Sequence, residues 1–176
     1  MLYAFYIASA VAVISTLGVI TGRHAVHALL YFIISLLAVA MIFLLFGAHF
    51  AAALEVIIYA GAIMVLFVFV MMMLNPGPRS VRKERHWLSP GTWVCPAVLA
   101  LILTAELIFL LASGTVGFHD GTAVTPREVG MALFGPYLLG VELVSILLLA
   151  GLVGAYHLAW RLGVSRADGA GEGRQS

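Results

Sequence analysis

Three glutamates, Glu55, Glu106 and Glu142, lie alone inside otherwise apolar stretches of the chain. No lysine or arginine shares those stretches, so none of the three acids has a basic partner in its own segment. On insertion scales an acidic side chain at the centre of a membrane helix costs about 2.5–3.5 kcal/mol. Carboxyls in such positions normally face protein or a water-filled interior, where they can bind and pass protons. The sequence therefore predicts that these acids are either protonated or paired with groups on other subunits.

The composition is that of an integral membrane protein, with 63% hydrophobic residues, 10% charged residues and a mean hydropathy of +1.11. Five apolar windows can cross a hydrocarbon core, which takes about 20 helical residues. They cover residues 2–20, 26–46, 51–74, 93–112 and 136–160. The windows lack strand alternation, and only helices of this length satisfy their backbone groups in lipid. We expect an all-α, polytopic membrane protein whose five transmembrane helices form one domain over residues 1–162.

The chain begins with an apolar segment and ends with a polar one. The first window lacks a basic segment before it, since the first positive charge is Arg23, so we expect a retained helix rather than a cleaved signal. Residues 163–176 are rich in serine, glycine and acidic residues, and we expect a cytoplasmic, disordered tail there.

The distribution of basic residues predicts the orientation. With five spans, eight of the nine fall on one side of the membrane: Arg23, Arg79, Arg82, Lys83, Arg85, Arg161, Arg166 and Arg174. Only Arg127 falls on the other side. The positive-inside rule then places the N-terminus outside and the C-terminus in the cytoplasm.

The third window carries two polar side chains and a run of small residues. Glu55 and Tyr59 are four residues apart, so on a helix they share one face. Gly61 follows, between Ala60 and Ala62. These small residues either let a neighbouring helix approach closely or mark a pliable point where the helix bulges or rotates. The local sequence leaves both alternatives open.

The three acids all lie in the outer halves of their windows, where a carboxyl can extend to water or relay protons. Glu142 is placed deepest, which favours a functional role, and Ser145 is close enough along the helix to hydrogen-bond it.

Between the fourth and fifth windows, the segment from Thr125 to Glu128 has capping-box spacing with Pro126 at the first helical position. It predicts a short interfacial helix before the last span.

Few other residues suggest chemistry. The six histidines lie in loops or at window ends without metal-ligand spacing, and Cys95 is the only cysteine. We therefore expect no metal and no cofactor on this chain. The basic run at 79–85 is better explained by contact with anionic lipid than by nucleic-acid binding.

Two stretches resemble a known family. Residues 53–75, ALEVIIYAGAIMVLFVFVMMMLN, are similar to the third helix of the J-type membrane subunit of NADH–quinone oxidoreductase, respiratory complex I. A second stretch agrees, with Gly130, Leu133-Phe134 and Tyr137, then ELVSILLL from Glu142, and Gly154-Ala155. Length, five spans and orientation also fit the bacterial family, so the resemblance covers residues 1–162.

The resemblance implies a non-catalytic subunit of a proton-translocating respiratory enzyme in the bacterial inner membrane. Partner subunits would carry flavin mononucleotide (FMN), iron–sulfur clusters and quinone. The expected neighbours are the quinone-chamber subunit and the K-type, A-type and antiporter-like subunits, with lipid around them. In this family the third helix has a π-bulge whose conversion to α-helix is implicated in opening a water path. By analogy, the residues of a proton path or gate would be Glu55, Tyr59, Gly61, Val65 and Glu142.

Two other functions fit the sequence. A small subunit of a multisubunit cation/proton antiporter would transport ions without electron transfer. A purely structural helix bundle would tolerate substitution of its glutamates without loss of pumping.

Overall fold

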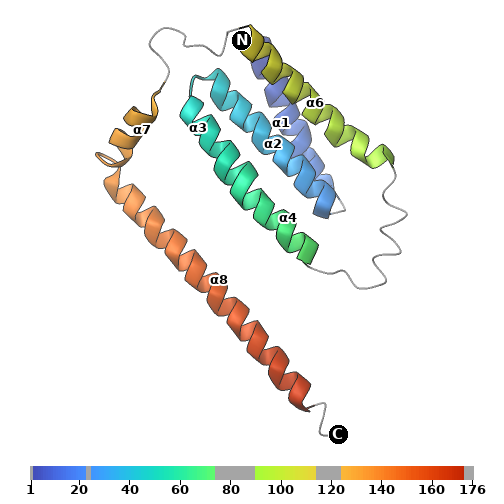
Figure 1. Ribbon diagram of the computed structural model, residues 1–176, viewed down its shortest axis with the longest axis vertical. Coiled ribbons are helices and arrows are strands. Elements are labelled where there is room, and N and C mark those ends of the chain that lie inside the picture. The colour runs from blue at the N-terminus through green and yellow to red at the C-terminus, as the bar shows by residue number, and fades with distance from the viewer. Residues whose placement is uncertain (1, 23–24, 74–89, 114–123, 173–176) are drawn as a thin grey trace. The chain divides into compact units, whose positions relative to one another are not determined.

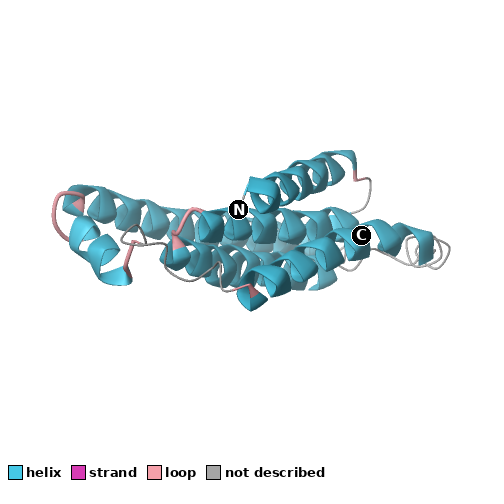
Figure 2. Cartoon of the chain, turned by 90° about the horizontal axis from the view of Figure 1, so that it is seen from above, coloured by secondary structure: helices cyan, strands magenta, loops and turns pink. Residues whose placement is uncertain are grey.

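The structure, a computed structural model, describes residues 2–22, 25–73, 90–113 and 124–172. Within these ranges it contains helices and short connections but no strand (Figure 2). The helices, labelled in Figure 1, are α1 (Leu2–Thr21), α2 (Ala25–Leu45), α3 (His49–Leu54), η1 (Glu55–Ile63), α4 (Met64–Met73), α6 (Pro90–Ala112), α7 (Pro126–Leu133) and α8 (Leu138–Glu172).

Five of the described segments are long and apolar enough to cross a membrane. They are Leu2–Thr21, Ala25–Leu45, His49–Met73, Trp93–Ala112 and Leu138–Trp160. The third segment joins α3, η1 and α4 into one continuous span. The predicted all-α fold with five transmembrane helices is confirmed, while the sides on which the termini lie remain a prediction from charge.

The chain divides into two compact units, and the first comprises residues Met1–Thr125. In this unit α2 is central, because α1, α6 and all three parts of the third span pack against it. Two clusters of buried side chains hold α1, α2 and α6 together. One contains Val11, Ile34, Ala38, Leu99 and Leu103, and the other contains Ala8, Met41 and Leu110.

A polar contact joins α1 and α2 inside the first unit. The hydroxyls of Thr16 and Ser35 lie 2.9 Å apart and share a hydrogen bond, and the Thr16 hydroxyl also reaches the Ala12 carbonyl. Hydrogen bonds of this kind between membrane helices contribute about 0.6 kcal/mol on average. The contact therefore adds little to the apolar packing around it.

A tight turn connects α2 to the third span. Gly47 has a φ of 77°, a left-handed conformation that a residue with a Cβ seldom adopts. The Ala48 N–H donates to the Phe43 carbonyl, and the Ala52 N–H donates to the Ala48 carbonyl, each at 2.9 Å. The first turn of the third span is thus linked through Ala48 to the end of α2.

The second unit, residues Pro126–Ser176, contains α7 and α8. The predicted short helix before the last span is present, and it begins at Pro126. The helix of the last span does not end near residue 162, since α8 continues to Glu172 where the sequence predicts a disordered tail. Extending an existing helix adds one hydrogen bond for each residue fixed, so a polar stretch can continue an apolar helix.

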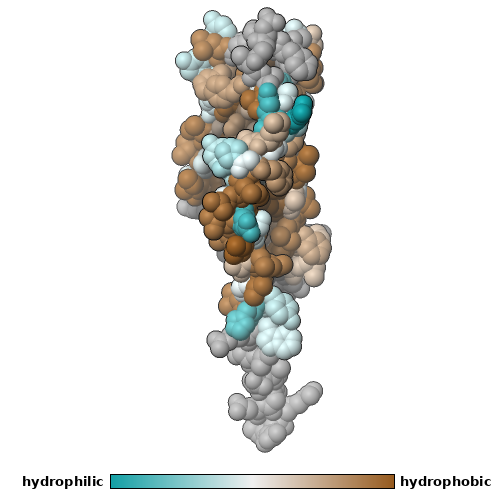
Figure 3. All heavy atoms as spheres, turned by 90° about the vertical axis from the view of Figure 1, so that its left-hand side faces the viewer, coloured by the Kyte–Doolittle hydropathy of each residue, from teal (hydrophilic) through white to brown (hydrophobic). Residues whose placement is uncertain are grey.

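Much of the surface is apolar. Brown, hydrophobic side chains cover most of the coloured face in Figure 3. No side chain between residues 138 and 160 of α8 is buried. Apolar surface on this scale suits lipid and neighbouring helices.

Candidate proton-path segment

The third span contains a nine-residue π-helix, η1, between two α-helical parts. At its end the Met64 N–H reaches the carbonyl of Tyr59, five residues back, in place of the α-helical partner four residues back. This segment includes the Tyr59-Ala60-Gly61 sequence at which the family resemblance implies a π-bulge. π-helical segments are rare and frequently lie at functional sites.

Gly61 lies where the π-helix leaves little room for a side chain. A Cβ built on Gly61 would stand 3.1 Å from the Val56 carbonyl oxygen, which also lies five residues back. This separation is tighter than nine in ten Cβ contacts in proteins, so the neighbouring backbone would have to shift by a few tenths of an ångström. The absence of a side chain at Gly61 therefore helps to accommodate the wide turn.

Buried residues bracket η1, but η1 itself has none. Ala52, before it, is 3% exposed, and Met64, directly after it, is 1% exposed. Between them Glu55 is half-buried and Tyr59 is 49% exposed. Val65, at the start of α4, is 64% exposed. The predicted residues of the third span therefore lie on a segment whose ends are packed and whose middle is open.

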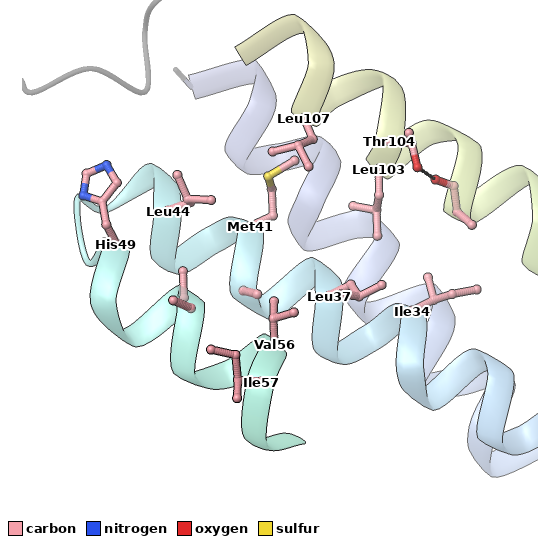
Figure 4. Close-up of a pocket in the computed structure, with 14 residues that line it drawn as sticks. Ile34, Leu37, Met41, Leu44, His49, Val56, Ile57, Leu103, Thr104 and Leu107 are labelled. Carbon is pink, nitrogen blue, oxygen red and sulfur yellow. Dashed lines mark hydrogen bonds between the residues drawn. The ribbon is translucent and has the colours of Figure 1, made fainter. Parts of the chain in front are cut away.

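An apolar groove of about 520 Å³ lies beside this segment. Its walls come from α2, α3, η1 and α6, as the labelled side chains in Figure 4 show. Val56 and Ile57 contribute the η1 side, Leu103 and Leu107 contribute the α6 side, and His49 lies at one end. The groove leaves η1 without a helix of the first unit packed along this side.

Glu142 lies on α8 in the second unit, and its side chain is exposed. The local hydrogen bond considered for it is not formed, because the Ser145 hydroxyl donates to the Val141 carbonyl at 3.0 Å. A serine in a helix commonly bonds back to the carbonyl four residues earlier, and this competes with side-chain partners. The structure therefore leaves the role of Glu142 as a prediction.

Glu106 is the acid whose position the sequence indicated least well. It is 9% exposed, and it lies between Leu103 and Leu110 on the buried face of α6. The spacing of Leu99, Leu103, Glu106 and Leu110 places all four on one helical stripe, which is the signal that could have shown its burial.

The described ranges contain no group of three or more His, Cys, Asp or Glu side chains that could hold a metal ion.

A family model and several curated proteins with related names match this chain. The family model for NADH-ubiquinone/plastoquinone oxidoreductase chain 6 matches residues 15–158. A protein of Pseudomonas aeruginosa named NADH-quinone oxidoreductase subunit J is 61% identical over 90% of this chain and 96% of its own length. The protein of the same name from Escherichia coli strain K12 is 51% identical over 98% of this chain and 90% of its own length. A more distant one, from Rhodobacter capsulatus, is 34% identical over 90% and 81%. The chain belongs to the NADH-ubiquinone/plastoquinone oxidoreductase chain 6 family.

Proposed function

We propose that this chain is a membrane-arm subunit of a proton-pumping NADH–quinone oxidoreductase and that it helps to form and gate a proton path. It performs no redox chemistry itself. The family membership supports its place in the complex, and the π-helix η1 is the observation that supports gating. The same chain would then be part of an enzyme without holding the reacting groups.

The proposal of a gate is based on the geometry of the third span. A π-bulge holds one residue more than an α-helical turn, so its loss turns the following helix by about 100°, given 3.6 residues per turn. Both the packed ends and the open middle of this span suit such a change. In one form of the helix polar groups line a water path, and in the other apolar side chains replace them.

Each predicted residue has a distinct part in this mechanism. Glu55 and Tyr59 are the polar groups beside the path, and Gly61 is the pliable position at which the wide turn forms. Val65 is an apolar side chain that rotates with α4. Glu142 either lies on the path or fixes a contact of α8 with another subunit.

The chemistry of electron transfer belongs to other subunits in this proposal. FMN, iron–sulfur clusters and quinone bind there and pass electrons from NADH to quinone. The proposed neighbours in the membrane are the quinone-chamber, K-type, A-type and antiporter-like subunits, together with lipid. They would cover the apolar side chains that this chain exposes on α8 and along η1.

Purification of the tagged chain from membranes in mild detergent tests membership. We expect flavin, iron–sulfur signals and NADH oxidation to copurify with the chain. Copurification of an ion-exchanging assembly without flavin would support the antiporter alternative and contradict the proposal. The gating part has its own test, the substitutions at Gly61 developed in the Discussion.

A further inference from the structure

Glu106 occupies a core position of the first unit. It lies on α6, one turn from Leu103, which packs with Val11 and Ala38, and one turn from Leu110, which packs with Ala8. Both carboxyl oxygens are shielded from solvent, and neither has a hydrogen-bond partner among the described residues. The path proposed above does not use this acid.

The helices packed against α6 supply no charge to balance a carboxylate. The titratable side chains that the structure describes on α1 are Tyr3 and Tyr6, both exposed. Those on α2 are His27 and Tyr31, near the end of α2 opposite Met41, and the one on α6 itself is Cys95. Arginine and lysine are absent from all three helices. A partner subunit has no open approach, because the carboxyl oxygens are enclosed by this chain.

An ionised carboxyl without a partner is the most costly group that can be placed in such a site. A neutral carboxylic acid costs far less. A leucine in this position would complete the stripe of Leu99, Leu103 and Leu110 without any cost of burying a polar group. Packing alone therefore needs only an apolar side chain at this position, and it does not account for an acid.

We propose that Glu106 is a proton-binding site separate from the path along the third span. Its carboxyl holds a proton while α6 is packed against α1 and α2. The proton passes to water only when that contact opens, and the O–H bond then breaks to leave a carboxylate. Proton release from this site is therefore coupled to separation of α6 from α1 and α2.

The test uses the whole detergent-purified complex with two variants, E106Q and E106L. Glutamine keeps the size of the side chain but cannot release a proton, and leucine repeats the neighbouring residues of the stripe. Infrared difference spectra on reduction by NADH are recorded in H₂O and in D₂O. We expect the wild type to show a carbonyl band of a neutral carboxyl that shifts in D₂O and is missing from both variants. An unchanged band in either assembled variant overturns the proposal.

Alkaline incubation provides a second measurement. Ionisation of Glu106 would place a charge between α6 and its neighbours, so wild-type complex should lose quinone reductase activity at lower pH than E106L. Equal alkaline limits for wild type and E106L contradict a buried proton. Both measurements use complex in which copurified flavin and NADH oxidation have already shown membership, so failure here is distinct from failure of the proposed function.

Discussion

Substitution of Gly61 is the sharpest test of the π-helix. A Cβ at this position would stand 3.1 Å from the Val56 carbonyl oxygen, where ordinary contacts begin at 3.4 Å. Overpacking of this kind costs about 1 kcal/mol at the lower end of the measured range. Because 1.4 kcal/mol is a factor of ten, Gly61→Ala should reduce the ratio of π-helix to α-helix about fivefold. The higher helix propensity of alanine favours both helical forms and does not change this ratio.

Gly61→Val should act more strongly than Gly61→Ala. Valine adds two methyl groups on the Cβ, and its side chain is restricted at χ1 in a helix. We expect coupled quinone reduction and proton pumping to fall by up to about fivefold for alanine and further for valine. NADH oxidation with an artificial acceptor should stay near wild type, because such acceptors take electrons from the peripheral arm.

Two controls separate this effect from general damage. Gly154→Ala adds a Cβ that meets nothing within 4 Å, and Ile63→Val removes one methylene from a side chain that is 37% exposed. Both should be mild. The assays compare equal amounts of assembled complex, measured from the flavin content. Wild-type coupled rates in fully assembled Gly61→Val complex would refute the argument that this position controls the gate.

Three further predictions concern other parts of the chain. If the Glu142 carboxyl relays protons, Glu142→Gln should lower pumping per NADH in assembled complex. If it only holds a helix contact, Glu142→Ala should lower the amount of assembled complex instead. Normal pumping and assembly in both variants would exclude either role. The isolated chain should be unstable in detergent, because no side chain between residues 138 and 160 is buried, and a sharp thermal transition of a monodisperse monomer would contradict this. Thr16→Val removes the hydrogen bond to Ser35 and should cost about 0.6 kcal/mol, so complex yield on native gels should barely change; a large loss would show that the bond matters more than its geometry suggests.

The sequence predicted the spans well because each is a long apolar run bounded by charged or glycine- and proline-containing segments. The π-helix could not be derived in the same way, since a hydrogen-bond shift from four residues to five leaves no mark on hydropathy. The small residues around Gly61 left a bulge as one of two alternatives, and the family resemblance favoured it. Burial of Glu106 depends on how α1 and α2 pack against α6, so its depth along the helix was a poor guide. The bond from Ser145 to its own helix backbone likewise depends on a side-chain rotation that spacing does not determine.

The turn at Gly47 fixes one end of the third span. Because hydrogen bonds through Ala48 link α3 to the end of α2 and Ala52 is buried, the first part of the span is held in place. If η1 gates as proposed, its change of twist turns α4 and has to move the buried Met64 as well. A side-chain tip about 5 Å from the helix axis moves about 8 Å when α4 turns by about 100°. In the proposed gate, the loss of a few π-helical hydrogen bonds would thus displace side chains along α4 while α3 stays in place.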